Sequence, residues 1–336
     1  MDFFQMLNSL FSLLGDALIN HPADTFHAAL IAATPLALGA YCGLYCERAG
    51  VVNIGIEGMM LIAAETSQLI AQYVGSRWIG TPLEPYGLPV ALLVGILTGV
   101  LLGALHAWLS IRFRVNQIIS GTVINIAALG ITGALYNMFL AGGEANGVPV
   151  SPGTFPVIPI PVLKDIPFLG PVFFQNQPIC YAMLVITIVT HFVLFHTPWG
   201  LRTRAVGEHP RAADTLGISV YRTRYISVII GGALAGLAGS WFTLEQVGTF
   251  NLMMTGGRGF IALACMIFGK WTPLGSFGAA ILFGLANALQ IDVQVSGSQI
   301  PFQFLAMAPY ILTVLVLAGF VGRAVAPAAD GIPYDK

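Results

Sequence analysis

The residues best placed for chemistry in this sequence are polar side chains inside long apolar runs. Asn53, Glu57 and Gln68 fall within an arc of about 60° if this stretch of the chain is helical. Gly55 and Gly58 flank Glu57, so the backbone can open there and expose its amide groups. Polar side chains in apolar spans usually face a bundle interior or a water-filled path, which makes these residues candidates for a substrate path.

Two further polar groups extend this candidate path, each at one end or on one face of an apolar run. They are Asn125, Thr132 and Tyr136 in the run 117–140, and Trp241, Glu245 and Gln246 at the end of the run 226–247. Such side chains can hydrogen-bond and stack on a purine or a ribose, but they bind other polar solutes as well. Hydrogen bonding between helices of the protein itself is the competing interpretation for each residue.

Glu57 is a carboxylate near the start of an apolar run, where an unpaired charge is costly. It either holds a proton or pairs with Arg48 or Arg258. We expect it to act as a structural lock on a broken helix rather than to contact substrate directly.

Enzymatic motifs are missing from the sequence. It has no phosphate-binding Gly-x-x-x-x-Gly-Lys-Ser/Thr loop, no His-Glu-x-x-His zinc motif and no Gly-x-Ser-x-Gly elbow with a plausible base. Cys42 and Cys46 are one helical turn apart, but no further ligand completes a metal site, and we interpret them as buried small hydrophobes. We therefore expect no catalytic residues, no metal and no cofactor in this chain.

The composition predicts the kind of structure that holds these polar residues in place. Of the 336 residues, 56% are apolar and only 9% are charged, where a soluble domain has about a quarter charged. Apolar runs of the length that crosses a bilayer recur along the chain. They predict an all-α polytopic membrane protein, with residues 1–336 forming a single transmembrane domain and no cleaved signal. Ten segments are predicted: 3–20, 25–46, 54–73, 88–109, 117–140, 178–197, 226–247, 259–270, 272–291 and 301–322. The segment 259–270 is too short to span, so we expect it to be re-entrant or half of a broken helix.

The positions of Lys and Arg predict the orientation. If the N-terminus is cytoplasmic and the spans alternate, eleven of the fourteen Lys and Arg residues lie at cytoplasmic ends, and Arg77, Lys164 and Arg258 lie outside. Cytoplasmic loops carry such an excess, so both termini are predicted to be cytoplasmic. Residues 141–177, rich in Gly and Pro, then form an extracytoplasmic loop over the pore mouth, and residues 198–225 form the main cytoplasmic loop.

Glycine spacing predicts close helix packing. Gly95, Gly99 and Gly103 repeat every four residues, as do Gly232 and Gly236. Such stripes of small residues let neighbouring helices approach closely within a membrane.

The cytoplasmic loop contains signals for a short helix within 207–217. Pro210 suits the first helical turn, Glu208 complements the positive N-terminal end, and Gly217 suits a left-handed stop before Ile218. A helix of about two turns is too short to be stable alone. It would present Ala212, Ala213 and Leu216 to a partner, although an ordinary surface loop fits the same residues.

Three stretches carry a resemblance to a known family. Glu47-Arg-Ala-Gly-Val-Val-Asn53-Ile-Gly-Ile-Glu57 resembles the signature of permease subunits of nucleoside-type ATP-binding-cassette (ABC) importers, within the branched-chain amino acid and simple-sugar permease family. Residues 205–218 resemble the coupling helix of that family. Thr255-Gly-Gly-Arg-Gly-Phe and Ile267-Phe-Gly-Lys-Trp-Thr-Pro resemble its C-terminal motifs.

The resemblance implies a type II importer fold with about ten helices, in the bacterial cytoplasmic (inner) membrane. It implies that residues 207–217 dock on a separate cytoplasmic ATPase, which binds ATP and Mg²⁺. The residues that this assigns to coupling are Gly207, Glu208, Pro210, Arg211, Ala212, Ala213 and Gly217. It further implies a second, non-identical permease subunit and an extracytoplasmic protein that delivers a nucleoside or nucleobase. Nucleic acid is not among the expected partners.

Two alternatives remain open at this point. The same machinery could import a simple sugar. A gradient-driven secondary transporter, with Glu57, Glu65 and Glu245 as a proton relay, would need no ATPase. The docking loop, and the lack of a basic residue deep in the spans to pair with these acids, argue against the second alternative.

Overall fold

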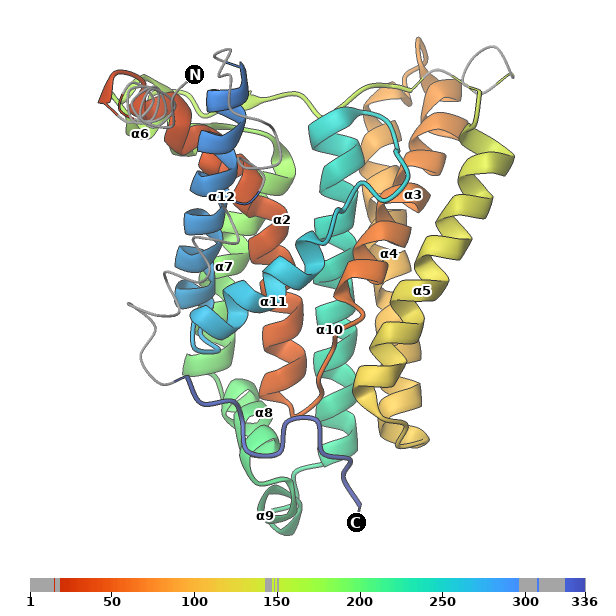
Figure 1. Ribbon diagram of the computed structural model, residues 1–336, viewed down its shortest axis with the longest axis vertical. Helices are drawn as coiled ribbons and strands as arrows, with labels where there is room; N and C mark the ends of the chain where they lie inside the picture. The colour runs from red at the N-terminus through yellow and green to blue at the C-terminus, as the bar shows by residue number, and fades with distance from the viewer. Residues whose placement is uncertain are drawn as a thin grey trace, which may run out of the picture.

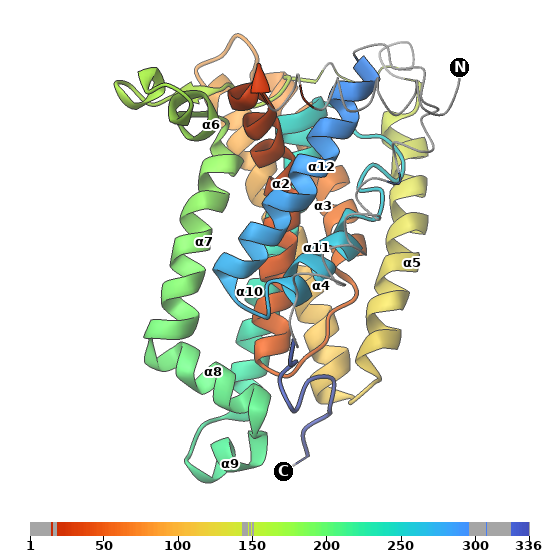
Figure 2. The same cartoon turned by 60° about the vertical axis from the view of Figure 1, so that its left-hand side comes forward.

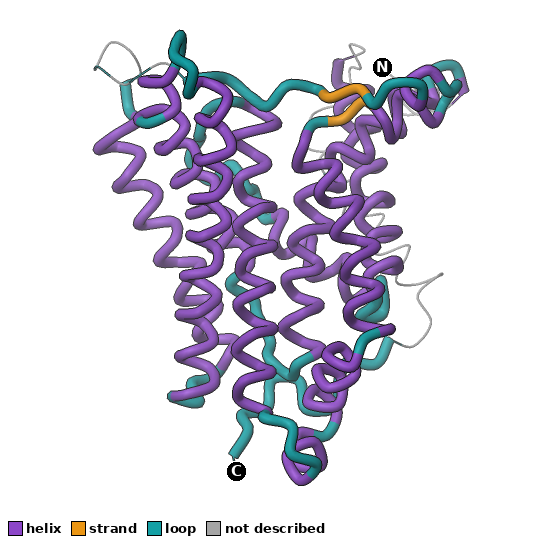
Figure 3. The backbone as a smooth tube through the Cα atoms, turned by 180° about the vertical axis from the view of Figure 1, so that it is seen from behind, coloured by secondary structure: helices purple, strands orange, loops and turns teal. Residues whose placement is uncertain are grey.

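The structure is a computed structural model that describes residues 15, 19–142, 147, 149, 151–295, 307 and 324–335. Its long helices run side by side between two ends of one bundle (Figure 1). One end carries α8 (Pro198–Glu208) and α9 (Pro210–Thr215), and the other carries α6 (Leu169–Phe174) and the antiparallel pair β1 (Ile158–Pro159) and β2 (Gln175–Asn176). Figure 3 shows this strand pair at the end opposite α9.

Two helices form the centre of the bundle. They are α2 (Pro22–Arg48) and α10 (Val220–Trp241), which continues as the wider turn η7 (Phe242–Val247). Their most apolar stretches are 89% and 78% buried. Such burial inside protein explains why these helices tolerate polar and small residues along their length.

Four helices surround this centre with apolar faces outward. They are α4 (Gly87–Ala107, continuing as η3, Trp108–Arg112), α5 (Gln117–Leu135, continuing as η4, Tyr136–Leu140), α7 (Pro178–His196) and α12 (Pro273–Val295). Only 22% to 33% of their apolar stretches is buried. Leu93, Leu97 and Leu101 of α4, for example, form an exposed stripe at four-residue spacing. Outward apolar faces of spanning length identify an all-α, multi-pass membrane protein.

The predicted glycine contact between two helices is confirmed. A Cβ on Gly99 of α4 would lie 2.6 Å from the Cα of Gly236 in α10, and one on Gly103 would lie 3.0 Å from the Cα of Gly232. Any side chain at these positions would push the two backbones apart.

Two helices begin inside the bundle rather than at its ends. After α2, residues 49–55 lead from the α9 end into the bundle, where α3 (Ile56–Tyr73) starts, and α11 (Arg258–Phe268) crosses the bundle obliquely (Figure 2). With 11 residues, α11 is about 16 Å long, half of the hydrocarbon thickness of a bilayer. The prediction of a broken segment near 259–270 is confirmed.

Smaller elements close the end opposite α9. Between α3 and α4 lie η1 (Gly75–Trp78) and η2 (Glu84–Tyr86), and η6 (Leu163–Asp165) precedes α6.

Helices are found for eight of the ten predicted segments, and six of the described helices are long and apolar enough to span a membrane. The predicted segments 3–20 and 301–322 lie almost wholly outside the described residues, so the number ten stays a prediction.

A helix, α9, lies within the predicted range 207–217, but it does not include the first residues of that range. Gly207 and Glu208 end α8, and the chain turns at His209, whose φ of −138° and ψ of 78° are not helical. The helix begins at Pro210, because the fixed φ of proline suits the first position of a helix. It ends as predicted, with Gly217 at φ +80° and the Ile218 N–H donating to the Ala213 carbonyl at 3.1 Å.

Candidate substrate cavity and its supports

A cavity of about 910 Å³ lies between α2, η7, α11 and α12, towards the end of the bundle opposite α9. Its polar lining comes from all four elements and includes Asp24, Gln177, Gln246, Asn251, Arg258, Asn287 and Asp292. The volume is in the range that holds a small organic solute.

Aromatic rings form one wall of this cavity. Trp241 and Phe242 meet edge to face with centroids 5.1 Å apart. The Arg258 guanidinium lies over the Phe242 ring at 5.4 Å and also donates to the Met254 carbonyl at 3.2 Å. These two contacts hold the Arg258 guanidinium at the N-terminus of α11, against the aromatic wall.

Carboxamides supply the free hydrogen-bonding capacity. Gln246, Asn251 and Asn287 all line the cavity, and within the described part of the chain none of these side chains has a hydrogen-bond partner. Each amide offers both donors and an acceptor. The cavity can therefore bind a neutral solute that carries donors and acceptors of its own.

Glu57 holds the start of α11 beside this cavity. Its carboxylate accepts hydrogen bonds from the Thr255 hydroxyl (2.6 Å) and from the N–H groups of Gly257 (2.8 Å) and Gly259 (2.6 Å). The first N–H groups of a helix have no partner within it, and a carboxylate there also favours the helix dipole. Glu57 therefore caps α11. Arg48, one of the ion-pair partners considered for Glu57, instead donates to the Trp271 carbonyl at 2.7 and 2.9 Å.

Asn53 and Asn125 hold the backbone break before α3. The Asn53 side chain accepts from the Gly55 N–H at 3.0 Å, and Asn125 accepts from the Gly58 N–H at 2.8 Å while donating to the Ile54 carbonyl at 3.0 Å. Asn53 precedes α3, so the expected helical arc with Glu57 and Gln68 is wrong. These amides satisfy backbone groups that a broken helix leaves open inside a membrane.

Glu245 has a similar role at α7. Its carboxylate accepts from the Ile179 N–H in the first turn of that helix, and its carbonyl accepts from the Gln177 side chain at 3.2 Å. Gln177 in turn lines the cavity. Glu245 is 5% exposed and does not line the cavity itself. It supports the cavity wall indirectly, by holding Gln177 in place.

The remaining predicted path residues make contacts elsewhere. Thr132 is buried and donates to the Ala128 carbonyl of its own helix at 2.8 Å, and the Tyr136 ring lies 6.2 Å from that of Phe250. Of the seven predicted path residues, only Trp241 lines the cavity. Gln246, which was predicted to lie beside Trp241, lines it as well.

Sequence reasoning missed most of the polar lining. Asn287 and Asp292 lie in and just after a predicted apolar run, but they are five residues apart on α12, which is not the three- or four-residue spacing of one helix face. Asn251 and Arg258 lie in or next to the loop before α11, where no periodicity exists to detect them.

At the opposite end, the residues predicted for coupling divide into two groups. Gly207 packs on the backbone of Arg48, and Ala213 is 2% exposed in a cluster with Val206 and Val220. The prediction that Ala213 faces a partner is therefore wrong, because it faces the core of this chain. The side chains of Glu208, Arg211, Ala212 and Leu216 are exposed, with Pro210 partly so and Gly217 at the exposed turn.

The chain matches the family described as the permease component of branched-chain amino acid transport systems over residues 26–324. No solved structure matches it.

Three relatives cover nearly the whole chain. It is 44% identical to the guanosine ABC transporter permease NupQ of Bacillus subtilis, over 92% of this chain and 95% of the relative. It is 40% identical to the nucleoside ABC transporter permease NupC of Lactococcus lactis, over 91% and 95%. A putative glucose ABC transporter permease of Haloferax volcanii is 35% identical over 90% and 92%.

Proposed function

The chain belongs to the family of permease components of branched-chain amino acid transport systems, and on that premise we propose that it is the permease subunit of an ABC importer for nucleosides or nucleobases. In this proposal it lies in the bacterial cytoplasmic membrane and carries solute through the bundle. The polar cavity beside Trp241 carries the proposal, because it lies between the central helix α2, η7, α12 and the start of α11, which begins inside the bundle.

The substrate class is supported by the wall chemistry. Three carboxamides that have no hydrogen-bond partner among the described residues, together with two aromatic rings, suit a neutral, flat solute with donors and acceptors at its edge. A nucleobase has these properties. The similarity to permeases named for guanosine and for nucleosides points the same way.

The energy source is proposed to be a separate ATPase that binds ATP and Mg²⁺. It would dock on the exposed residues of α9 and the turn after it, above all Arg211, Ala212 and Leu216, which is 81% exposed. That end of the bundle would be cytoplasmic, in line with the many arginines of α8, α9 and the start of α10. A binding protein would deliver solute to the cavity end, beside a second, non-identical permease.

Import of a simple sugar is the second candidate, favoured by the putative glucose permease at 35% identity. Aromatic rings and amides also bind sugars. The two candidates differ in which solute the complete transporter takes up.

Uptake by the complete complex in proteoliposomes tests the proposal. With ATP supplied on the α9 side, we expect uptake of guanosine or adenosine, competed by unlabelled nucleosides and not by glucose or ribose. Glucose uptake without nucleoside competition would establish the sugar candidate. Uptake driven by a proton gradient without ATP would refute both.

Docking is tested with Ala212→Arg and Leu216→Glu, two exposed positions. We expect both variants to lose the co-purifying ATPase. Leu83→Glu, at an exposed leucine near the other end, should retain it. Retention of the ATPase by all three variants would contradict the assignment of α9.

A further inference from the structure

The C-terminal residues 327–335, here called the tail, cross the end of the bundle that carries α9 (Figure 1). The Ala329 N–H donates to the Gly207 carbonyl at 2.9 Å, and the Ala328 N–H donates to the Glu208 carboxylate at 3.1 Å. Both acceptors belong to the last two residues of α8. The tail is therefore attached at the point where the chain turns into α9.

The tail also forms part of the surface on which α9 rests. Tyr334 is 6% exposed and lies in one buried cluster with Ala213 of α9, Val206 and Val220. A helix of six residues is not stable by itself. Its one buried face packs on a cluster that includes this tyrosine, so the position of α9 depends on the tail.

A buried arginine joins the tail to the segment that leads into α3. Arg224, which is 2% exposed, donates to the Ile332 carbonyl at 3.0 Å and to the Ala49 carbonyl at 3.1 Å. Next to it, a Cβ on Gly50 would lie 3.0 Å from the Ala329 carbonyl oxygen. The tail and residues 49–50 are thus in direct contact, a few residues before Asn53 and the broken start of α3.

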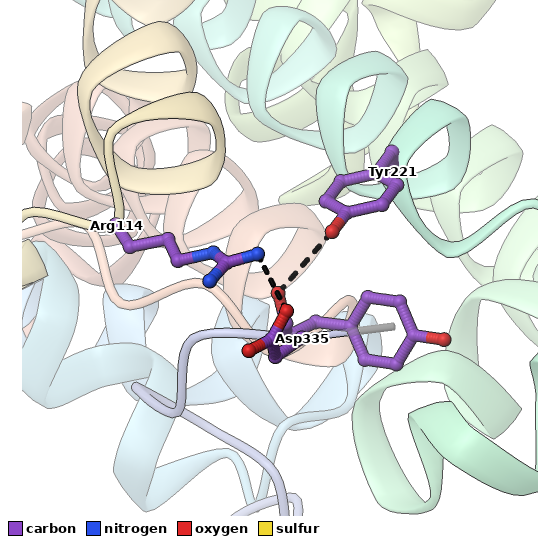
Figure 4. Close-up of polar contacts among 4 residues, drawn as sticks. Arg114, Tyr221 and Asp335 are labelled. Atoms are coloured by element: carbon purple, nitrogen blue, oxygen red, sulfur yellow. Dashed lines mark hydrogen bonds and ion pairs between the residues drawn. The ribbon is translucent and has the colours of Figure 1, made fainter.

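The last described residue of the tail is fixed to the link between α4 and α5. The Arg114 guanidinium pairs with the Asp335 carboxylate at 2.6 Å, and the Tyr221 hydroxyl donates to the Tyr334 carbonyl at 3.5 Å (Figure 4). Both Arg114 and Asp335 are exposed to solvent. This ion pair adds little stability, because exposed pairs contribute about 0–1 kcal/mol. It does fix the position of Asp335 against Arg114.

We propose that the tail is a positioning element that links α9 to the broken start of α3, so that a displacement of α9 is passed to residues 49–55 and from there to Glu57 and α11. This rests on the proposed ABC importer function. A displacement of α9 could also be transmitted through α10, which follows it in the chain. However, α10 is a continuous helix packed against α4 through glycine contacts, so it cannot move without moving α4. The tail is not part of any helix, yet it contacts α8, α9 and α10, the segment between α2 and α3, and the segment between α4 and α5.

The experiment uses the complete transporter with Tyr334→Ala, which removes the ring beside Ala213, and Arg114→Ala, which releases the end of the tail. Lys164→Ala, at an exposed residue towards the opposite end, is the control. Co-purification of the ATPase, ATP hydrolysis and ATP-driven uptake are measured on the same preparations. We expect both tail variants to assemble and hydrolyse ATP, with solute transported per ATP reduced at least tenfold for Tyr334→Ala and several-fold for Arg114→Ala.

The outcomes separate the two proposals. If the wild type takes up solute with ATP and the tail variants keep its solute-to-ATP ratio, the tail has no positioning role and the importer assignment stands. A fall of uptake and hydrolysis in the same proportion, together with a lower melting temperature, would show a merely structural tail and also overturn the inference. If Tyr334→Ala does not fold, Arg114→Ala decides alone. A wild type without ATP-driven uptake of any solute overturns both.

Discussion

The Glu57 carboxylate and the N–H of Gly259 form a hydrogen bond of 2.6 Å between the first turn of α3 and the first turn of α11. Both helices begin inside the bundle, and this bond joins their starts. A Cβ on Gly259 would lie only 2.6 Å from the Cα of Glu57, so the two backbones touch as well. The two broken helices therefore form one unit beside the polar cavity, and moving one requires moving the other.

Removing the Glu57 carboxylate should release α11. Glu57→Ala leaves two N–H groups and one hydroxyl without their acceptor, and hydrogen bonds to a charged group contribute about 1.5–3 kcal/mol each. We expect a lower melting temperature and loss of uptake, with Glu57→Gln intermediate because one acceptor oxygen remains. Glu84→Ala is the matched control, since Glu84 also accepts a loop N–H, from Gly80 at 2.8 Å, but is exposed. Equal effects of the two alanine variants would contradict this.

Gly259→Ala tests the backbone contact itself. The added methyl group would overlap the Glu57 backbone, and such overpacking costs about 1–3 kcal/mol. We expect reduced uptake even though the carboxylate is intact. In Gly278→Ala of α12 the new methyl group meets nothing within 4 Å, so it should transport like the wild type. Wild-type uptake by Gly259→Ala would mean that α3 and α11 do not need this close approach.

Glu245 distinguishes a helix cap from a proton relay. As a cap it needs only an acceptor oxygen for the Ile179 N–H, which Gln also provides. We therefore expect Glu245→Gln to keep most of the uptake and Glu245→Ala to lose at least tenfold. A relay requires a group that releases protons, which neither variant has, so loss of uptake in the glutamine variant as well as in the alanine variant would favour a gradient-driven transporter.

Polar residues of the cavity should set the affinity for the solute. Gln246→Leu and Asn287→Leu each remove a carboxamide that has no partner among the described residues, and a hydrogen bond contributes about 0.5–1.5 kcal/mol, or about 2- to 12-fold in affinity. We expect the KM for uptake to rise by that factor while basal ATP hydrolysis is unchanged. Gln290→Leu is the control, because Gln290 lies on the same helix and does not line the cavity. An unchanged KM in both variants would place the solute elsewhere.

Hydropathy and glycine spacing predict the helices and the α4–α10 contact well, because both are local properties of the chain. The same holds for α9, which begins at Pro210 and is followed by Gly217. Glu57 was predicted as a lock on a broken helix, and its contacts agree with that role. Its partner could not be predicted, since Gly257 and Gly259 are about two hundred residues away and offer only backbone N–H groups.

The path residues show the opposite case. Asn53, Asn125 and Glu245 were predicted from their polarity within apolar runs, yet all three bind backbone groups of this protein. Polarity inside a span indicates that a hydrogen bond is needed, but not whether the partner is a solute or a broken helix. The tail was missed altogether, because its contacts depend on segments that only the fold brings together.

Asp330 makes the attachment of the tail depend on pH. It lies beside the Glu47 carboxyl and the Arg224 guanidinium, and burial raises its pKa from 3.8 to about 6, although Glu47, the Gly331 N–H and Arg224 oppose the shift. The folded protein thus binds this proton more tightly than the unfolded chain. The resulting stability is fully present below about pH 4 and is lost as the pH rises through about 6.

Asp330→Asn, which stays neutral, should therefore match the wild type near pH 4 and be more stable above about pH 7, by at most about 3 kcal/mol. Thermal unfolding of both proteins from acidic to neutral pH measures this difference. Asp165→Asn, at an exposed acid near the opposite end, controls for the loss of one negative charge. If Asp330→Asn were less stable than the wild type at neutral pH, the attraction to Arg224 would outweigh burial, and the charged form would be the one that holds the tail.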